Sequence, residues 1–161
     1  MAATSTDRGS TRARRRVVGM LVGLGAGWSP VVASTKPLLE VWKSPTCGCC
    51  KDWVAHVEAN GFDVRVHDVG NTAMRGRLGM PAKLGSCHTA KLGPYAIEGH
   101  VPAREVHRLL TEKPEAVGLA VPGMPIGSPG MDGPQYGPRK DAYDVLLVRK
   151  DGSTTPFQTY R

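Results

Sequence analysis

The sequence has little of what membrane-spanning and nucleic-acid-binding proteins need. Its apolar run from Val17 to Trp28 is shorter than the roughly 20 residues of a transmembrane helix. Aromatic residues make up 6% of the 161 residues, and most of the formal charge of +7 falls on residues 1–33, where five arginines face one aspartate. The rest of the chain has no basic run. We therefore expect no nucleic-acid partner and no stable insertion of the mature chain in a membrane.

Cysteine is also scarce, and its distribution excludes several common uses. Three of the four cysteines lie in "TCGCC", at Cys47, Cys49 and Cys50, and the fourth is Cys87. Structural zinc sites and iron–sulfur centres usually take their cysteines from separated pairs or spaced runs, which this chain does not have. A disulfide between adjacent residues is strained, so simple cross-links are disfavoured as well. We interpret the crowded triplet as a chemical site.

The N-terminal segment has the layout of a secretory signal peptide. Arginines at positions 12 and 14–16 precede the short apolar run, and small residues follow up to Ala33. The paired arginines and the glycines in the apolar run resemble a twin-arginine signal. We predict a signal peptide over residues 1–33 and a periplasmic domain over residues 34–161. An uncleaved arm or anchor is the alternative interpretation.

Hydrophobic periodicity predicts strands and helices in alternation. In chain order the expected elements are a strand at 38–43, a helix from about Cys50 to Asn60, a strand at 62–69, a helix at 72–78, a hairpin of strands 89–92 and 95–98, and a helix at 102–113. This order resembles the thioredoxin and glutaredoxin folds. It places the cysteine triplet at the carboxyl edge of the first strand, where active chemistry is common in such sheets.

Two further segments extend this order. Residues 118–138 are dense in Gly and Pro and carry Met124 and Met131, and long loops of this kind usually have a function. The methionines are either soft ligands for a transient metal or solvent-exposed spacers. Residues 143–160 predict a terminal hairpin. The expected fold is therefore α/β and thioredoxin-like, with an added Gly/Pro/Met-rich loop and a C-terminal β-hairpin.

The position of Cys87 suggests a metal site. In thioredoxin-like folds a cis-proline faces the C-x-x-C pair, and here that place reads Ser86-Cys87-His88-Thr89. A cysteine there would bring a fourth thiolate to face the triplet. His88 either adds an imidazole or only hydrogen-bonds its loop. His100, just before the last predicted helix, either supports the site from behind or hydrogen-bonds its own loop.

The donor types favour copper. Thiolates, thioethers and an imidazole are soft or borderline ligands, which select Cu(I) or zinc over hard cations. Three thiols within four residues are awkward around one tetrahedral ion and suit thiolates that bridge several small Cu(I) ions. Copper is therefore the first choice and zinc the second.

Four segments together are similar to one known family. They are "SPTCGCCKDWVAHVEANGF", "GMPAKLGSCHTA", "YAIEGHVPAREVHRLL" and "GLAVPGMPIGSPGM". They resemble the exported, thioredoxin-like copper-resistance proteins of the CopG type, long listed only as a family of unknown function. The resemblance implies a periplasmic protein that holds several Cu(I) ions in a thiolate-bridged site for copper resistance, with copper redox activity and other periplasmic copper-handling proteins as partners. The metal ligands that it implies are Cys47, Cys49, Cys50 and Cys87, with His88, Met124 and Met131 as auxiliary ligands.

An enzymatic alternative stays open. Cys47 and Cys50 have the C-x-x-C spacing of a thiol–disulfide oxidoreductase, and the nearby helix N-terminus would favour the thiolate of Cys47. The missing cis-proline disfavours this function. Cys49 also lies between the two and would compete for any mixed disulfide. A scaffold with inert cysteines is the remaining interpretation.

Overall fold

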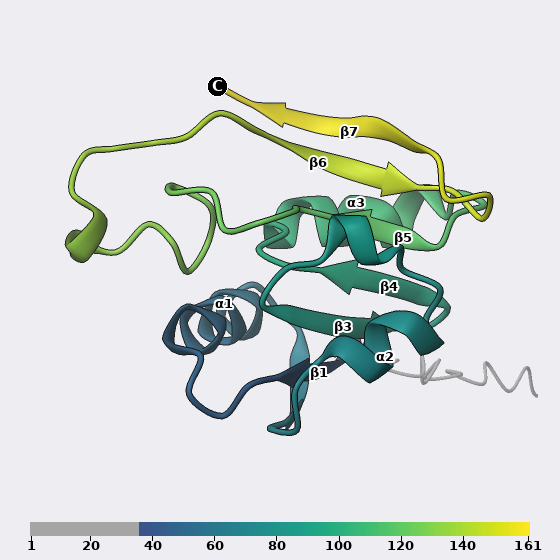
Figure 1. The fold of residues 1–161 in the computed structure, drawn as a ribbon, viewed down its shortest axis with the longest axis horizontal. Helices are drawn as coiled ribbons and strands as arrows, with labels where there is room; N and C mark the ends of the chain where they lie inside the picture. Colours follow the sequence, from purple (N-terminus) through teal and green to yellow (C-terminus); the bar gives the residue numbers. More distant parts are fainter. Residues whose placement is uncertain (1–35) are drawn as a thin grey trace, which may run out of the picture. The chain divides into compact units, whose positions relative to one another are not determined.

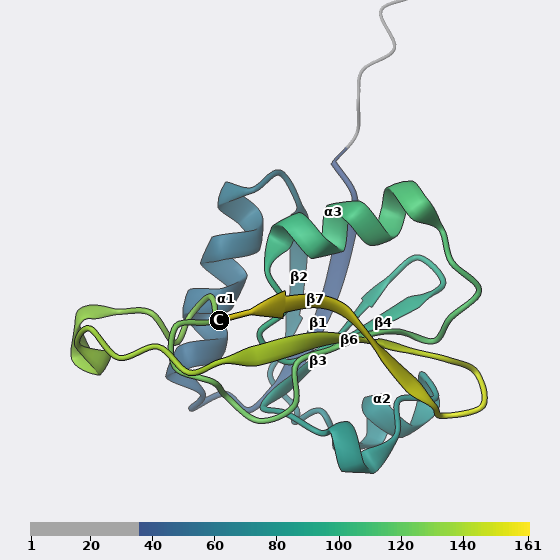
Figure 2. The same cartoon turned by 90° about the horizontal axis from the view of Figure 1, so that it is seen from above.

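The structure, a computed structural model, describes residues 36–161, so the signal peptide predicted for residues 1–33 lies outside the described residues. The described chain is a seven-stranded mixed sheet with α-helices on both faces (Figures 1 and 2). The strands are β1 (Leu38–Lys43), β2 (Asp63–His67), β3 (His88–Leu92), β4 (Tyr95–Glu98), β5 (Gly118–Ala120), β6 (Tyr143–Val148) and β7 (Thr154–Tyr160). The α-helices are α1 (Gly48–Ala59), α2 (Thr72–Arg77) and α3 (Ala103–Glu112), with 3₁₀ turns at Ala82–Leu84 and Pro134–Tyr136.

The sheet topology brings two distant segments to one edge. The strand order is β2-β1-β3-β4-β5-β6-β7, with β1 parallel to β2 and antiparallel to β3. The carboxyl end of β1 therefore lies beside the start of β3. The predicted hairpin is confirmed, since β3 and β4 pair from Leu92↔Tyr95 to Thr89↔Glu98 around a turn in which Gly93 has φ 55°. The order of elements predicted for residues 38–113 is the observed one.

Two apolar clusters lie on opposite faces of the sheet. Trp53 and Val57 of α1 and Val106 of α3 are fully buried in the larger cluster, together with Leu39 and Val41 of β1. The smaller cluster lies on the other face, beneath α2 and the turn that follows it, and its buried members are Met80, Leu84, Ala96, Ala120 and Val148. Figure 2 shows α1 and α3 on one side of the strands and α2 on the other. Among the described residues, no helix combines the length and hydrophobicity that a membrane span requires.

The C-terminal part differs from the expectation at one point. Residues 118–138 were expected to be loop throughout, but they begin with β5, which pairs with β4 and β6. A strand of three residues followed by Pro122 has no periodic pattern of its own, so its neighbours define it. The predicted terminal hairpin is confirmed as β6 and β7. Pro156 is tolerated within β7 because that strand lies at the edge of the sheet.

Candidate metal centre

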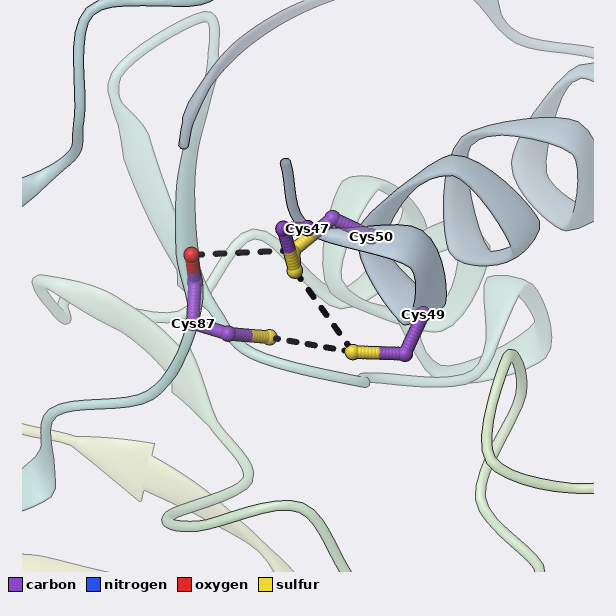
Figure 3. Close-up of side chains that lie close together, drawn as sticks. All are labelled: Cys47, Cys49, Cys50 and Cys87. Atoms are coloured by element: carbon purple, nitrogen blue, oxygen red, sulfur yellow. Dashed lines mark hydrogen bonds between the residues drawn. A yellow bond between two sulfur atoms is a disulfide. The ribbon is translucent and has the colours of Figure 1, made fainter. Parts of the chain in front are cut away.

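Four cysteine sulfurs meet at the carboxyl edge of β1. Cys47 occupies the capping position before α1, and its backbone N–H donates to Ser44 O at 3.2 Å. Cys49 and Cys50 follow in the first turn, so the helix begins slightly earlier than predicted. Cys87 enters from the segment that leads into β3 (Figure 3). The four Sγ atoms all lie within 4.8 Å of one another.

The distances from Cys49 Sγ to two of the other sulfurs are close to those between thiolates that share a metal ion. Cys49 Sγ lies 3.6 Å from Cys47 Sγ and 3.9 Å from Cys87 Sγ. With metal–sulfur bonds of about 2.3 Å, two thiolates on one ion lie roughly 3.7 to 4.6 Å apart. The cysteines are half-buried except for Cys50, which is fully buried. The cluster is therefore sheltered and still open to an incoming ion.

The cysteines are in two redox states. Cys47 and Cys50 form a disulfide, whereas Cys49 and Cys87 are free thiols. The disulfide occupies two of the four donors, because a disulfide sulfur cannot bind metal as a thiolate does. All four sulfurs become thiolate ligands only after two electrons reduce this bond.

Cys87 lies between the other thiols and two histidines. Its Sγ is 3.0 Å from His100 Nε2 and 3.5 Å from His88 Nδ1. Burial, and next the neighbouring Cys49, raises the pKa of the Cys87 thiol to about 12. At neutral pH this thiol is therefore protonated, and a metal must displace its proton in order to bind.

Both histidines are buried and uncharged. Burial holds the pKa of His88 well below 6.5 and lowers that of His100 as well. His88 is fully buried against the Trp53 ring, at 4.2 Å between ring centroids, and its Nε2 has no hydrogen-bond partner. His100 Nδ1 lies 2.8 Å from Pro129 O. A carbonyl oxygen can only accept, so Nδ1 carries the proton and the lone pair of Nε2 faces Cys87.

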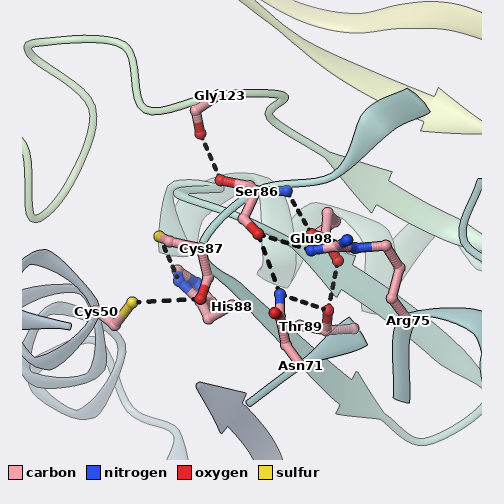
Figure 4. A network of polar contacts seen from close by, with 9 residues as sticks. All are labelled: Cys50, Asn71, Arg75, Ser86, Cys87, His88, Thr89, Glu98 and Gly123. Carbon is pink, nitrogen blue, oxygen red and sulfur yellow. Dashed lines mark hydrogen bonds and ion pairs between the residues drawn. The ribbon is translucent and has the colours of Figure 1, made fainter. Parts of the chain in front are cut away.

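A polar network holds the backbone beside Cys87 (Figure 4). The fully buried Glu98 carboxylate accepts the Ser86 N–H at 2.6 Å, the Thr89 hydroxyl at 2.6 Å and Arg75 Nε at 2.9 Å. Ser86 O in turn accepts from Arg75 Nη2 at 2.7 Å and from Asn71 Nδ2 at 3.1 Å. Burial raises the pKa of Glu98 despite these donors. The network therefore holds both the backbone N–H and the backbone carbonyl of Ser86, the residue directly before Cys87.

The Gly/Pro-rich loop lies against the site at two points. Ser86 Oγ donates to Gly123 O, and Gly130 packs so closely on α1 that a Cβ there would lie 2.6 Å from Cys49 O. Met124 follows the first contact and is 50% exposed, whereas Met131 follows the second and is buried. Met131 Sδ accepts from the Tyr136 hydroxyl at 3.3 Å. Within the described residues neither thioether is hydrogen-bonded to a cysteine sulfur, so their role as ligands stays a prediction.

The sequence did not single out His100 as a direct neighbour of Cys87, although the hairpin register contains that signal. In this antiparallel hairpin, which starts from the pair Leu92↔Tyr95, each step back along β3 is matched by one step forward along β4. Two steps beyond Thr89↔Glu98, the same register places Cys87 opposite His100. The ladder does continue in that direction, since Gly99 N donates to His88 O at 3.0 Å. Extending the predicted hairpin by two residue pairs would therefore have predicted the contact.

Part of the site falls within a known family model, which includes Cys87 but not the three cysteines at positions 47, 49 and 50. The model described as "Protein of unknown function, DUF411" matches residues 84–131, a stretch that runs from just before Cys87 to Met131. Two solved structures of copper resistance protein CopG, forms 1 and 2, are 44% and 42% identical to this chain. Each covers 78% of this chain, and the match spans 98% and 99% of theirs, with TM-scores of 0.71 and 0.72.

The chain belongs to the CopG family of copper-resistance proteins. A comparison with curated proteins finds no match. Membership of the CopG family and the cluster of four cysteines together point to copper handling. The resemblance noted in the sequence is thus confirmed at the level of the family.

Proposed function

We propose that this CopG-family chain is an exported, periplasmic protein that holds several Cu(I) ions between the thiolates of Cys47, Cys49, Cys50 and Cys87. The observation that carries the proposal is the convergence of four sulfurs within 4.8 Å of one another. Four bridging thiolates supply enough soft donors for more than one Cu(I). His88, Met124 and Met131 are the auxiliary ligands.

The order of elements supports a thioredoxin-like fold as part of this proposal. A strand, a cysteine-bearing turn, a helix and a parallel strand are followed by an antiparallel hairpin and a helix. In that framework, the place that usually holds a cis-proline holds Cys87 instead. The change converts a surface that would bind a protein thiol into one that binds metal.

Copper redox activity belongs to the same proposal. A cluster on thiolates that bridge several ions would pass one electron to an oxidised one-electron acceptor on a partner protein for each Cu(I) converted to Cu(II). The half-buried sulfurs leave a path for a partner, which we propose is another periplasmic copper-handling protein.

Anaerobic titration of the reduced chain 34–161 with Cu(I), against a competing chelator, tests the proposal. We expect more than one tightly bound copper per chain, with thiolate-to-copper absorption. Cys49 Sγ lies 3.6 Å from Cys47 Sγ and 3.9 Å from Cys87 Sγ and can bridge ions between them, so Cys49→Ser should reduce the stoichiometry by at least half. Thr111→Ser, an exposed hydroxyl change on α3, is the control and should change nothing.

Thiol–disulfide exchange is the second candidate, and the Cys47–Cys50 disulfide favours it. The same titration separates the two functions. Failure of the reduced chain to bind copper, together with a Cys47–Cys50 disulfide that exchanges with glutathione, would reject copper storage in favour of dithiol chemistry.

A further inference from the structure

We propose that a cavity between the start of α3, the loop that joins β5 to β6 and the end of β7 binds a small aromatic carboxylate. The volume of the cavity is about 320 Å³, within the range of roughly 300 to 1,000 Å³ that is usual for small-molecule pockets. None of the four cysteines lines it, and among its lining residues only Pro129 also contacts the metal centre, through His100. The site therefore goes beyond copper handling.

Rings make up the apolar walls of the cavity. Tyr143 and Tyr160 stack on each other, with 4.7 Å between the ring centroids and 9° between the ring planes. Pro102 and Pro129 add two pyrrolidine rings to the same lining. A flat aromatic ligand can pack against such walls, because aromatic rings gain from specific ring–ring geometry as well as from burial. The chemistry of the walls therefore favours a planar, apolar ligand body.

Hydrogen bonds hold the tyrosine wall in place without a ligand. The Tyr160 hydroxyl donates to Glu105 Oε2 at 2.7 Å, and Arg104 Nε lies 2.9 Å from the other oxygen of this fully buried carboxylate. The negative charge of Glu105 is thus paired behind the tyrosine and does not repel an anion in the cavity. A preformed wall also lowers the free-energy cost of ordering the site when a ligand binds.

Lys140 gives the cavity a positive charge that is free for a ligand. Its ammonium group has no ion pair or hydrogen bond with any of residues 36–161. Asp141 is the one acid in the lining, and its oxygens already accept from Ile126 N–H at 3.0 Å and from Arg139 Nη2 at 2.8 Å. An unpaired cation beside apolar walls favours an anionic ligand.

The backbone also fixes the position of the Lys140 stem. Gly127 lies directly beneath it, with φ +94°, and a Cβ there would lie 3.1 Å from Lys140 Cγ. Arg161, the other cation in the lining, already lies 3.6 Å from an oxygen of Asp144. Lys140 is therefore the group that we expect to bind the carboxylate, while the rings hold the aromatic body.

Calorimetric titration of the metal-free chain 34–161 with 2-naphthoate tests the site. We expect one 2-naphthoate per chain, with a dissociation constant below about 1 mM for a ligand of this size. The uncharged analogue 2-naphthamide has the same rings and should bind roughly fivefold more weakly or worse, because it cannot pair with Lys140. Absence of naphthoate binding, or equal affinity for the two compounds, would overturn the proposal.

A lysine pair supplies the matched control. Lys140→Gln should weaken 2-naphthoate binding roughly fivefold and leave 2-naphthamide binding unchanged, since only the carboxylate loses its partner. Lys83→Gln removes an equally exposed charge from the turn that follows α2 and should leave the binding of both compounds unchanged. Both side chains are exposed, so both variants should fold, and equal melting temperatures verify this. Equal losses of affinity in the two variants would reject the assigned role of Lys140.

Amide chemical-shift mapping locates the bound ligand. Shifts at Gly127 and Tyr143 would place 2-naphthoate in the proposed cavity. Shifts confined to Leu38, Leu92 and Leu110, which line a second cavity of about 410 Å³, would overturn the proposal. Every measurement uses the chain without metal, so a failure of the copper titration would leave the result unchanged.

Discussion

Glu98 is the residue on which the geometry around Cys87 most depends. Its carboxylate is fully buried and takes all its hydrogen bonds from Arg75, Thr89 and the Ser86 backbone. A buried charge is tolerated only when it is paired and fully hydrogen-bonded. The ion pair therefore serves to fix the Ser86–Cys87 backbone, and its removal should be felt at the metal centre.

Glu98→Gln should lower the free energy of unfolding by about 3 kcal/mol, because it leaves the charge of Arg75 without its partner and puts an amide NH₂ against a donor. Urea denaturation measures the loss. Glu115→Gln is the matched control, since that carboxylate is 90% exposed and paired with Lys150. It should lower the free energy of unfolding far less than Glu98→Gln does, because an exposed ion pair is screened by solvent. Equal effects of the two substitutions would contradict the assigned role of Glu98.

At the scale of elements, α1 and α3 are joined by a histidine. His56 lies on α1, and its Nε2 accepts a hydrogen bond at 3.1 Å from the backbone N–H of Ala103, the first residue of α3. The first N–H groups of a helix have no partner within the helix, so an imidazole lone pair satisfies one of them. This acceptor exists only while His56 is neutral.

The stability of the protein should therefore fall in mild acid. Burial holds the pKa of His56 below 6.5, with Asp132 opposing the shift. The unfolded chain thus binds a proton more readily than the folded one, so the contribution of His56 is complete above its unfolded pKa and is lost as the pH falls towards the folded pKa. His88 and His100 are shifted in the same direction, also by burial.

Urea denaturation from about pH 8 to about pH 5 measures this dependence, and His56→Gln should make it less steep. At the upper pH the variant should be nearly as stable as the parent, because the glutamine oxygen can also accept from Ala103. An unchanged slope in the variant would show that His56 does not take part.

At the scale of the whole molecule, the loop that joins β5 to β6 also contacts the metal centre, which lies at the ends of β1 and β3. It contacts Ser86 through Gly123, His100 through Pro129 and the first turn of α1 through Gly130. In Figures 1 and 2 this green segment extends beyond the ends of β5 and β6, on the side where α1 lies. One loop thus holds three parts of the site together.

Gly130→Ala tests this arrangement. Gly130 has φ +83°, and a Cβ there would lie 2.6 Å from Cys49 O and 2.8 Å from Trp53 N. Strained backbone alone costs about 1 kcal/mol, and the clash adds to it, so we expect a loss of roughly 3 kcal/mol and weaker metal binding. Gly137→Ala is the control, with φ +62° and nothing within 4 Å. It should cost the strain alone and leave metal binding intact, and identical behaviour of both variants would exclude a role for the loop contact.

Local pattern accounts for most of the elements. Alternation in "FDVRVHDV", helical spacing of Trp53 and Val57, and the Asn60-Gly61 stop all correspond to observed structure, although β2 is shorter than its apolar pattern. β5 was missed because a strand of three residues, which begins at Gly118 and ends two positions before Pro122, is too short to show a period. The pairing of β5 with β4 and β6 decides its conformation, and no local signal reports it.

The sequence by itself determined that three thiols lie at a strand-to-helix turn and that Cys87 belongs with them, because the covalent spacing and the topology of the first strands leave little choice. Only the tertiary structure decided which histidine faces the sulfur, how Glu98 holds the backbone, and where the two methionines lie. These outcomes depend on side-chain directions and on contacts between residues far apart in the chain. Such contacts are selected by packing and by the hydrogen-bonding needs of buried polar groups, which local sequence does not encode.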